Sequence, residues 1–273
     1  LIRSVEVKDK KIVANGHTAA AILGERVSTK VIDNQNGEEA MRGLVSEMAA
    51  ITKNSLIESM SLIENYDDEK AEAVLKSEDE IDIFEDKISS YLLQISEQEL
   101  SQKDSREVSQ LLHVVGDVER ISDHSVNILS AAKEVYTKKV GFSPEAQREL
   151  SVMGNAVREI LSLATEALVN EDLNLAKKVE PLEQIIDKLK HKIKSNHVER
   201  LRQGECTIEL GFILSDILNN YERVADHCSN IAMCLLEIDN NSFQTHEYLT
   251  NVKETGANEF FEHYDMYKKR YTI

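Results

Sequence analysis

The sequence predicts an all-α protein of two tandem antiparallel three-helix bundles, six core helices in all, with an N-terminal extension and a C-terminal helical tail. Three observations predict this class. The 273 residues include only 2 prolines and 10 glycines, so few positions interrupt a helix. Apolar residues recur with the helical period from about residue 38. The same pattern then returns about a hundred residues later, as a duplicated unit would produce.

Composition narrows the function classes. The formal net charge of −17 argues against nucleic-acid binding, which relies on Lys and Arg to neutralise phosphates. The hydrophobic fraction of 41% is enough to bury a core. No apolar stretch is long enough to span a bilayer, and no signal peptide is recognised. The odd set of three cysteines (Cys206, Cys228 and Cys234) has no C-x-x-C pair, which favours a reducing compartment.

Residues 1–37 are predicted to form the N-terminal extension. Val5-Glu6-Val7 and Lys11-Ile12-Val13 favour short extended pieces. Asn15-Gly16 and Asn36-Gly37 are turn signals.

The first bundle is predicted over residues 38–140. Its first helix runs from about Glu38 to Ile63, and Asp68 is the expected cap of the second. The polar stretch from Ser96 to Ser105 is predicted to be a loop before the third helix, which fades after Val135. The apolar stripes that predict these helices include Leu44, Met48, Ile51; Ala71, Ile81, Phe84, Ile88; and Leu111, Val115, Val118 and Leu129.

The second bundle is predicted over residues 141–240, and residues 241–273 form the tail. Ser143 is a good N-cap and Pro144 a good first helical residue, so a helix is expected to begin there. A turn follows at residues 170–172, and Pro181 is expected to kink the next helix near its start. Gln203-Gly204 then marks the loop before the last core helix, whose stripe includes Leu210, Leu214, Ile217, Tyr221, Val224 and Ile231.

The two halves overlay residue by residue. The segment 78–84 lies over 183–189 at an offset of 105, and Asn65 and Ala71 keep the same offset. After the next loop the offset becomes 103, where the run 119–128 lies over 222–231. A change of two residues at a loop is what a duplication tolerates.

Each repeat carries the pattern E-x-x-x-D twice, and these eight residues are the candidate metal ligands. A spacing of four places two side chains on one helix face, about 5–6 Å apart at Cβ. Like charges there destabilise an isolated helix, so the pattern requires a cation, basic neighbours or exposure to water. The four pairs are Glu78/Asp82, Glu119/Asp123, Glu183/Asp187 and Glu222/Asp226.

Two interpretations of these pairs stay open. A single E-x-x-x-D pair in an acidic helical protein is most often a solvated face, and the glutamates could also pair with Arg120 and Arg223. Placement at matched positions in both repeats gives the metal interpretation equal weight. Carboxylate oxygens suit divalent cations such as Mg²⁺, Ca²⁺ or Mn²⁺, and carboxylate clusters also hold iron. The expected cofactors are therefore divalent or iron-type metal ions.

Enzymatic activity is not predicted. His124 and His227 follow the aspartates directly and so point away from the carboxylate stripe, where packing or hydrogen bonding is their expected role. None of the eight histidines has a Glu three residues before it, as ferritin-like di-metal sites require. Nucleophile elbow, P-loop and Rossmann fingerprints are also missing from the sequence.

The repeated motifs resemble those of the PhoU family of phosphate-uptake regulators. In that family each three-helix repeat bears E/D-x-x-x-D motifs, the second within a run like E-R-[IV]-x-D-h-[AS]-x-N-I. Residues 119–128 and 222–231 fit that run, and the resemblance covers about residues 38–238. It implies two three-helix bundles whose carboxylates bind metal ions, often in clusters, and a regulatory role in phosphate uptake.

The tail resembles one particular group of proteins that carry such a domain. Thr245-His246-Glu247-Tyr248-Leu249, then Phe260, Tyr264 and Lys269-Arg270-Tyr271, look like the end of bacterial sodium/phosphate cotransporter-family proteins. Those proteins carry a PhoU-like domain on the cytoplasmic side of a membrane transporter. The resemblance thus implies a cytoplasmic domain at the inner face of the membrane. The implied partner is a phosphate transporter or the membrane domain of the parent protein, and a homo-oligomer stays open. The alternative is a purely structural interaction module without metal.

Overall fold

The computed structural model describes residues 5–8, 11–14, 34–97, 100–240 and 257–273. The elements are strands β1 (Val5–Lys8) and β2 (Lys11–Ala14) and helices α2 (Asn34–Ser61), α3 (Asp68–Ser96), α4 (Gln102–Lys138), α5 (Pro144–Asn170), α6 (Leu173–Ala176), α7 (Val179–Arg202), α8 (Ile208–Asn240) and α10 (Ala257–Arg270). The two strands pair antiparallel, which confirms the extended pieces expected in the N-terminal extension. The expected turn at residues 15–16 and the tail motif at 245–249 lie outside the described residues.

The first repeat differs from prediction only at helix ends. Helix α2 begins at Asn34, so Asn36-Gly37 lies in its first turn, where the backbone N–H groups need no partner within the helix. The cap of α3 is Asp67, one residue before the predicted Asp68, because its side chain accepts from the Lys70 N–H. Ser101 caps α4, so Gln102–Ser105 is an exposed first turn rather than loop. Polarity alone does not separate a loop from a solvated turn of helix.

The second repeat begins where the sequence predicted it. The Ser143 side chain accepts from the Ala146 N–H and Pro144 is the first residue of α5, which confirms the expected cap. The predicted second helix is split into α6 and α7 instead of being kinked. Pro181 has no N–H to donate to the Lys177 carbonyl four residues earlier, and the helix is interrupted at Lys177 and Lys178.

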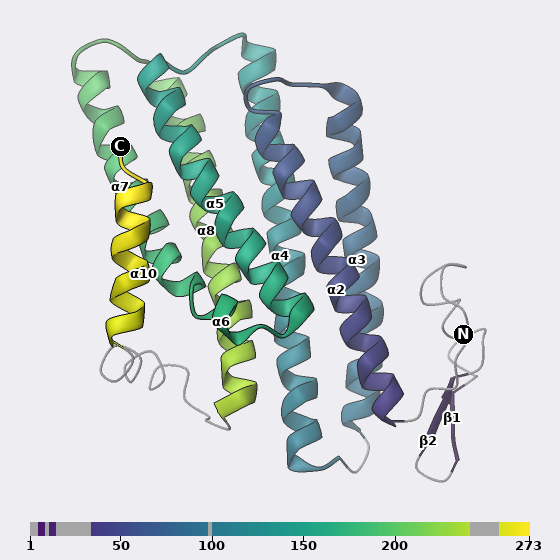
Figure 1. The fold of residues 1–273 in the computed structure, drawn as a ribbon. Helices are drawn as coiled ribbons and strands as arrows, with labels where there is room; N and C mark the ends of the chain where they lie inside the picture. Colours follow the sequence, from purple (N-terminus) through teal and green to yellow (C-terminus); the bar gives the residue numbers. More distant parts are fainter. Residues whose placement is uncertain (1–4, 9–10, 15–33, 98–99, 241–256) are drawn as a thin grey trace.

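The six long helices form two antiparallel bundles that share one core. Figure 1 shows α4 and α8 at the middle of the molecule, with α2 and α3 on one side and α5 and α7 on the other. Helices α4 and α8 make the largest contact between elements, and α2 also packs against α5. The fold class is therefore confirmed. The domain limits at residues 37, 140 and 240 remain predictions.

The core runs without a break through both repeats. Met48, Leu56, Ile121 and Ile128 belong to the same buried cluster as Met153 and many apolar residues of the second repeat. The cysteines are free thiols. Within the described ranges no helix combines the length and apolar character that crossing a membrane needs.

One buried ion pair interrupts the apolar pattern of the second repeat. Arg200 Nη2 on α7 lies 2.8 Å from Glu149 Oε2 on α5, and their side chains are only 9% and 5% exposed. The Asn196 amide also donates to Glu149, at 2.6 Å. At an offset of 105, the first repeat has Leu44 and Ile95 in their places, and both pack against the core.

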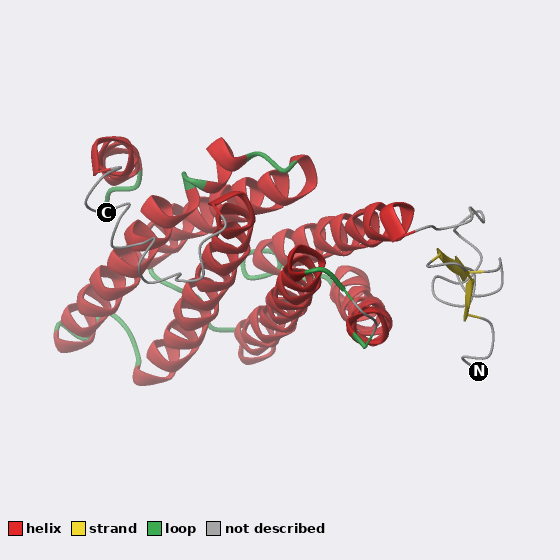
Figure 2. Ribbon diagram, turned by 90° about the horizontal axis from the view of Figure 1, so that it is seen from below, coloured by secondary structure: helices red, strands yellow, loops and turns green. Residues whose placement is uncertain are grey.

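The tail helix α10 packs along α7 at one edge of the bundle (Figure 2). Phe260 and Tyr267 are buried beneath it, at 6% and 1% exposure. Arg270 donates to both carboxylate oxygens of Glu159 on α5, at 2.6 and 2.8 Å, and the Tyr271 hydroxyl donates to the same carboxylate. The end of the chain is therefore tied to the second repeat by apolar and charged contacts.

Candidate functional site

The first repeat brings both of its E-x-x-x-D pairs together. Burial, and then the charge of Asp123 on α4, raise the pKa of Asp82 on α3. Burial and Asp123 likewise raise the pKa of Glu119, to which Asp82 adds from the facing helix. The pKa of Glu78 is raised by burial, then by Asp82. We call these four residues, two on each of α3 and α4, the repeat 1 array.

The repeat 1 array lies in negative surroundings. Asp79 and Asp86 on α3 also raise the pKa of Asp82, and Glu85 raises that of Glu119. The Arg120 guanidinium opposes the rise in the pKa of Glu119. Among the described residues, none of the four carboxylates of the array has a cationic side chain within ion-pair distance. Within the part of the chain that the structure describes, the negative charge of this array therefore has no paired counter-charge.

The second repeat gathers its pairs in the matching place, between α7 and α8. Burial raises the pKa of Glu183 to about 8, helped by Glu180 and then Asp226. The pKa of Asp226 is raised by burial and then by Glu222. Asp187 also contributes to the rise at Glu183. We call Glu183, Asp187, Glu222 and Asp226 the repeat 2 array.

The repeat 2 array carries its own cations. Lys190 Nζ lies 3.0 Å from Glu222 Oε1, with both side chains largely buried. Arg223 Nε lies 3.9 Å from Glu222 Oε2, which is the glutamate–arginine pairing that the sequence left open, and Arg223 Nη1 lies 3.4 Å from Asp226 Oδ2. At an offset of 105, the position of Lys190 is Glu85 in the first repeat. At this position the repeat 2 array therefore has an ammonium group, whereas the repeat 1 array has a further carboxylate.

The side chains of both arrays are of the type that binds metal ions, but they are not positioned around one ion. Carboxylate oxygens are the donors that hard cations prefer. Burial, and after it the charges of neighbouring carboxylates, raises the pKa of Glu78, Asp82 and Glu183. Throughout the described part of the chain, however, no three His, Cys, Asp or Glu side chains are placed to hold one ion. Like charges separate when no cation lies between them, so binding would require these side chains to turn inward.

The histidines lie at the seam between the repeats. His227 Nδ1 is 2.8 Å from Asp117 Oδ1, and His124 Nδ1 is 2.8 Å from Asn220 Oδ1. The two rings stack with centroids 5.6 Å apart. Asp117 and Asn220 are equivalent positions of the two repeats, since they are 103 residues apart, and so are His124 and His227. Each histidine therefore bonds to the same position in the opposite repeat. The expected hydrogen-bonding role of the histidines is confirmed.

Sequence reasoning missed Lys190 as part of a site. It sits one turn beyond the E-x-x-x-D pair and reads as an ordinary helix-surface lysine. The signal that could have identified it is the overlay of the repeats, which sets Lys190 against Glu85. A change of charge at a matched position next to a shared motif indicates that the two sites have diverged.

Comparison with known proteins matches the two repeats separately. The model of a family described as "PhoU domain" matches residues 45–132 and again residues 150–235. A relative from Thermotoga maritima, named phosphate-specific transport system accessory protein PhoU homolog 1, is 30% identical over 214 residues. That match covers 78% of this chain and 90% of the relative.

Solved structures share the fold. The crystal structure of PhoU from Pseudomonas aeruginosa superposes with a TM-score of 0.63 at 23% identity, over 76% of this chain and 96% of that one. The phosphate transport system regulatory protein PhoU from Streptococcus pneumoniae gives a TM-score of 0.68 at 17% identity, over 77% of this chain and 98% of that one. Both likenesses extend over nearly the whole of the solved chains.

Proposed function

The chain belongs to the PhoU family, and from this premise we propose that it is a non-enzymatic regulator of inorganic phosphate transport. The observation that carries the proposal is the separate match of the family model to both repeats. The relative from Thermotoga maritima bears the name of an accessory protein of a phosphate-specific transport system. We extend that role to this chain.

We further propose that the regulator binds divalent or iron-type metal ions through its E-x-x-x-D pairs, with the repeat 1 array as the stronger site. A bound cation should stabilise the repeat 1 array more, because no described basic side chain pairs with its carboxylates. In the repeat 2 array Lys190 already neutralises part of the negative charge. A metal ion at the repeat 1 array would draw α3 and α4 together, since each helix supplies one E-x-x-x-D pair.

The partner in this proposal is a phosphate transporter or the membrane domain of a parent protein, reached from the cytoplasmic side. The resemblance of the tail to sodium/phosphate cotransporter-family proteins supports that placement. Helix α10 is held against α7 and α5, so the described part of the tail stays with the second repeat.

A second candidate function is a structural interaction module that binds no metal. The observation that favours it is the placement of the carboxylates, which brings no three of them around one point in the described part of the chain. On this alternative both arrays are solvated acidic surfaces, and regulation would work through protein contacts alone.

Elemental analysis of the purified, untagged protein separates the two candidates. The metal-binding proposal predicts stoichiometric metal that is lost in Glu119→Gln/Asp123→Asn. The matched Glu222→Gln/Asp226→Asn variant removes the same number of charges from the repeat 2 array and should retain most of the metal. If the wild type holds no metal and its melting temperature is unchanged by Mg²⁺, Mn²⁺, Fe²⁺ or Zn²⁺, the interaction module is the better account.

The regulatory proposal is tested in a bacterial strain that lacks its own PhoU protein. Expression of the chain should lower the rate of radiolabelled phosphate uptake in phosphate-rich medium. The Glu119→Gln/Asp123→Asn variant, expressed to the same level, should lower it less. An uptake rate that stays the same with and without folded protein in the cells would contradict the regulatory role.

A further inference from the structure

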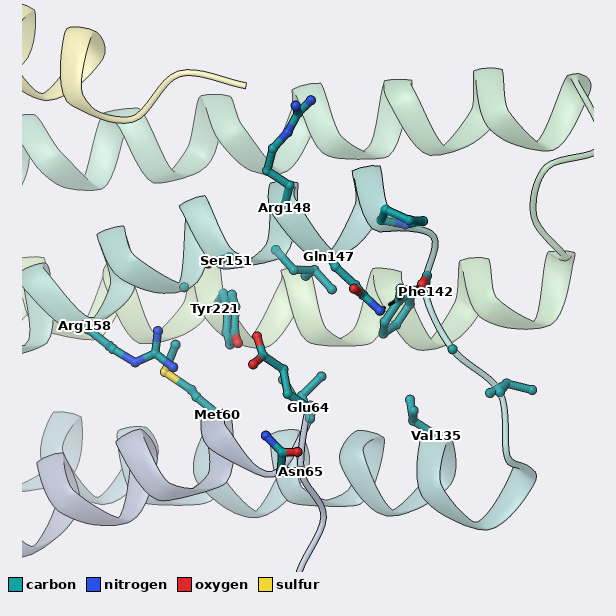
Figure 3. Close-up of a pocket in the computed structure, with 16 residues that line it drawn as sticks. Met60, Glu64, Asn65, Val135, Phe142, Gln147, Arg148, Ser151, Arg158 and Tyr221 are labelled. Carbon is teal, nitrogen blue, oxygen red and sulfur yellow. Dashed lines mark hydrogen bonds between the residues drawn. The ribbon is translucent and has the colours of Figure 1, made fainter.

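A cavity of about 630 Å³ lies where the two repeats meet. The end of α2 and the end of α4 supply one wall, and the α4–α5 connection, α5 and Tyr221 of α8 supply the rest (Figure 3). Its volume falls within the range of small-molecule sites. None of the eight carboxylate residues of the two arrays lines this cavity.

A tyrosine hydroxyl to which no described side chain bonds faces this cavity. Tyr221 is 3% exposed, and its hydroxyl oxygen points into the space beside Met60 and Glu64 in Figure 3. Among the described residues nothing hydrogen-bonds to this hydroxyl. Burial raises the pKa of Tyr221 well above its usual value, so the hydroxyl stays protonated and can donate.

A half-buried guanidinium stands next to that hydroxyl. Arg158 forms no ion pair with any described residue, and its contact with Asn155 Oδ1 is long, at 3.3 Å. A Cβ atom built on Gly154 would lie 3.4 Å from Arg158 Nη1 and 3.8 Å from the Tyr221 hydroxyl oxygen. The two donors therefore converge over a glycine, and the missing side chain leaves the floor of the cavity open.

The charges around the cavity favour an anion. Two arginines and one acid line it, in a chain whose net charge is −17. Figure 3 shows the Arg158 guanidinium turned towards Tyr221, whereas Arg148 points away from it. The acid is Glu64, which is exposed at the mouth. Apolar side chains such as Met60, Ile63 and Phe142 complete the lining.

We propose that this cavity binds a small anion through a phosphate or carboxylate group held by Arg158 and Tyr221. A guanidinium matches either group bidentately, and the hydroxyl adds a further donor. Because the volume exceeds that of a bare oxyanion, the apolar lining contacts the rest of an organic ligand. Its wall comes from both repeats, so the bound anion would hold the ends of α2 and α4 against α5 and α8.

Isothermal titration calorimetry with three probes tests the site: adenosine monophosphate, phenylacetate and inorganic phosphate. At least one should bind saturably at or below about 1 mM. Arg158→Gln should weaken that binding about tenfold or more, as expected for a charge-assisted hydrogen bond. Tyr221→Phe should weaken it several-fold while the melting temperature of the unliganded protein is maintained, because no described residue bonds to the hydroxyl that is removed.

Two matched variants make the outcome decisive. Arg148→Gln removes the same charge from the same cavity and should change the affinity less than about threefold. Glu64→Gln should tighten binding, since it removes a negative charge from the mouth. Failure of all three probes to bind at about 10 mM would overturn the proposal. Equal losses in Arg148→Gln and Arg158→Gln, or weaker binding in Glu64→Gln, would overturn it too.

The probes also distinguish the source of the anionic group. Tighter binding of adenosine monophosphate or phenylacetate than of inorganic phosphate would support an organic ligand seated on the apolar lining. Equal affinity for inorganic phosphate would support a free oxyanion on the same two donors. Adenosine, which is neutral, should not bind in either case.

Discussion

Replacing Glu149 with leucine should strongly destabilise the second repeat. The carboxylate lies on α5 between Arg200 and Asn196 of α7, and it is the ion-pair partner of a guanidinium that is 9% exposed. Glu149→Leu introduces an apolar side chain of similar size and leaves Arg200 charged and unpaired in the protein interior. The cost comes from that unpaired charge rather than from a lost contact.

The expected magnitude follows from the burial of the pair. Removing one partner of a buried ion pair costs about 3–5 kcal/mol because the other keeps its desolvation penalty. The distance of 2.8 Å and the exposure of 5% at Glu149 place this pair in that class rather than among surface pairs. Arg200 Nε already lacks a hydrogen-bond partner within the described structure, so the guanidinium has little alternative compensation.

The first repeat provides the design of the control. Leu44 and Ile95 occupy the matched positions and pack against the core. The double variant Glu149→Leu/Arg200→Ile should therefore return to within about 1 kcal/mol of the wild type, since replacing a buried pair with apolar residues is often neutral or stabilising. Urea unfolding followed by circular dichroism gives both free energies.

Two results would refute this reasoning. A loss below about 1 kcal/mol in Glu149→Leu would mean that water or a local rearrangement solvates Arg200. A double variant less stable than the single one would mean that the pair contributes through geometry that an apolar pair cannot replace. The second result would also show that the two repeats do not pack alike at this position.

Three further variants test other parts of the structure. Tyr267→Ala should release α10, because a large side chain that is 1% exposed is lost; limited proteolysis should then cut the tail faster while the bundle stays intact, and unchanged cleavage would contradict the docking. Thr52→Val should stabilise the protein by about 1 kcal/mol in thermal melts, since the buried hydroxyl has no described partner and Val157 fills the matched position; a lower stability would indicate an unseen partner. The pKa of Glu183 is raised from 4.5 to about 8, so between these pH values the carboxyl is protonated in the folded state and ionised in the unfolded state. The free energy of unfolding should therefore fall as the pH rises from about 4.5 to 8. In chelator, Glu183→Gln should lose less stability than the wild type over that range, and parallel curves would contradict the assignment.

The helical period and the repeat predicted most of the fold. Apolar side chains at every third or fourth position gave the six core helices, and Ser143-Pro144 marked the start of the second repeat correctly. Helix ends were less predictable. Gln102–Ser105 reads as a polar loop but forms a turn of helix, since exposed helical turns and loops have the same composition.

Contacts between residues far apart in the chain could not be predicted from the sequence. Glu149 and Arg200 are separated by 51 residues, and neither reveals the other until α5 and α7 are packed together. Tyr221 lies on the apolar stripe of its predicted helix, and burial was the expected outcome. That its hydroxyl would face a cavity depends on Gly154 and on how α2 meets α5, which no local pattern encodes.

The candidate carboxylates were found by their spacing, and the structure brings the pairs of each repeat together. Their role as metal ligands stays a prediction, because the spacing fixes which helix face they share but not how the side chains turn. The difference between the arrays was visible only in the overlay, as Glu85 against Lys190.

The seam between α4 and α8 has a consequence for how the two halves could diverge. Were each half a separate polypeptide in a symmetric pair, both histidines would necessarily face the same kind of residue. In the fused chain His227 faces an aspartate and His124 faces an asparagine. Covalent linkage thus frees each half to mutate alone at a shared contact, and Asp117 and Asn220 record one such independent change in an otherwise matched pair.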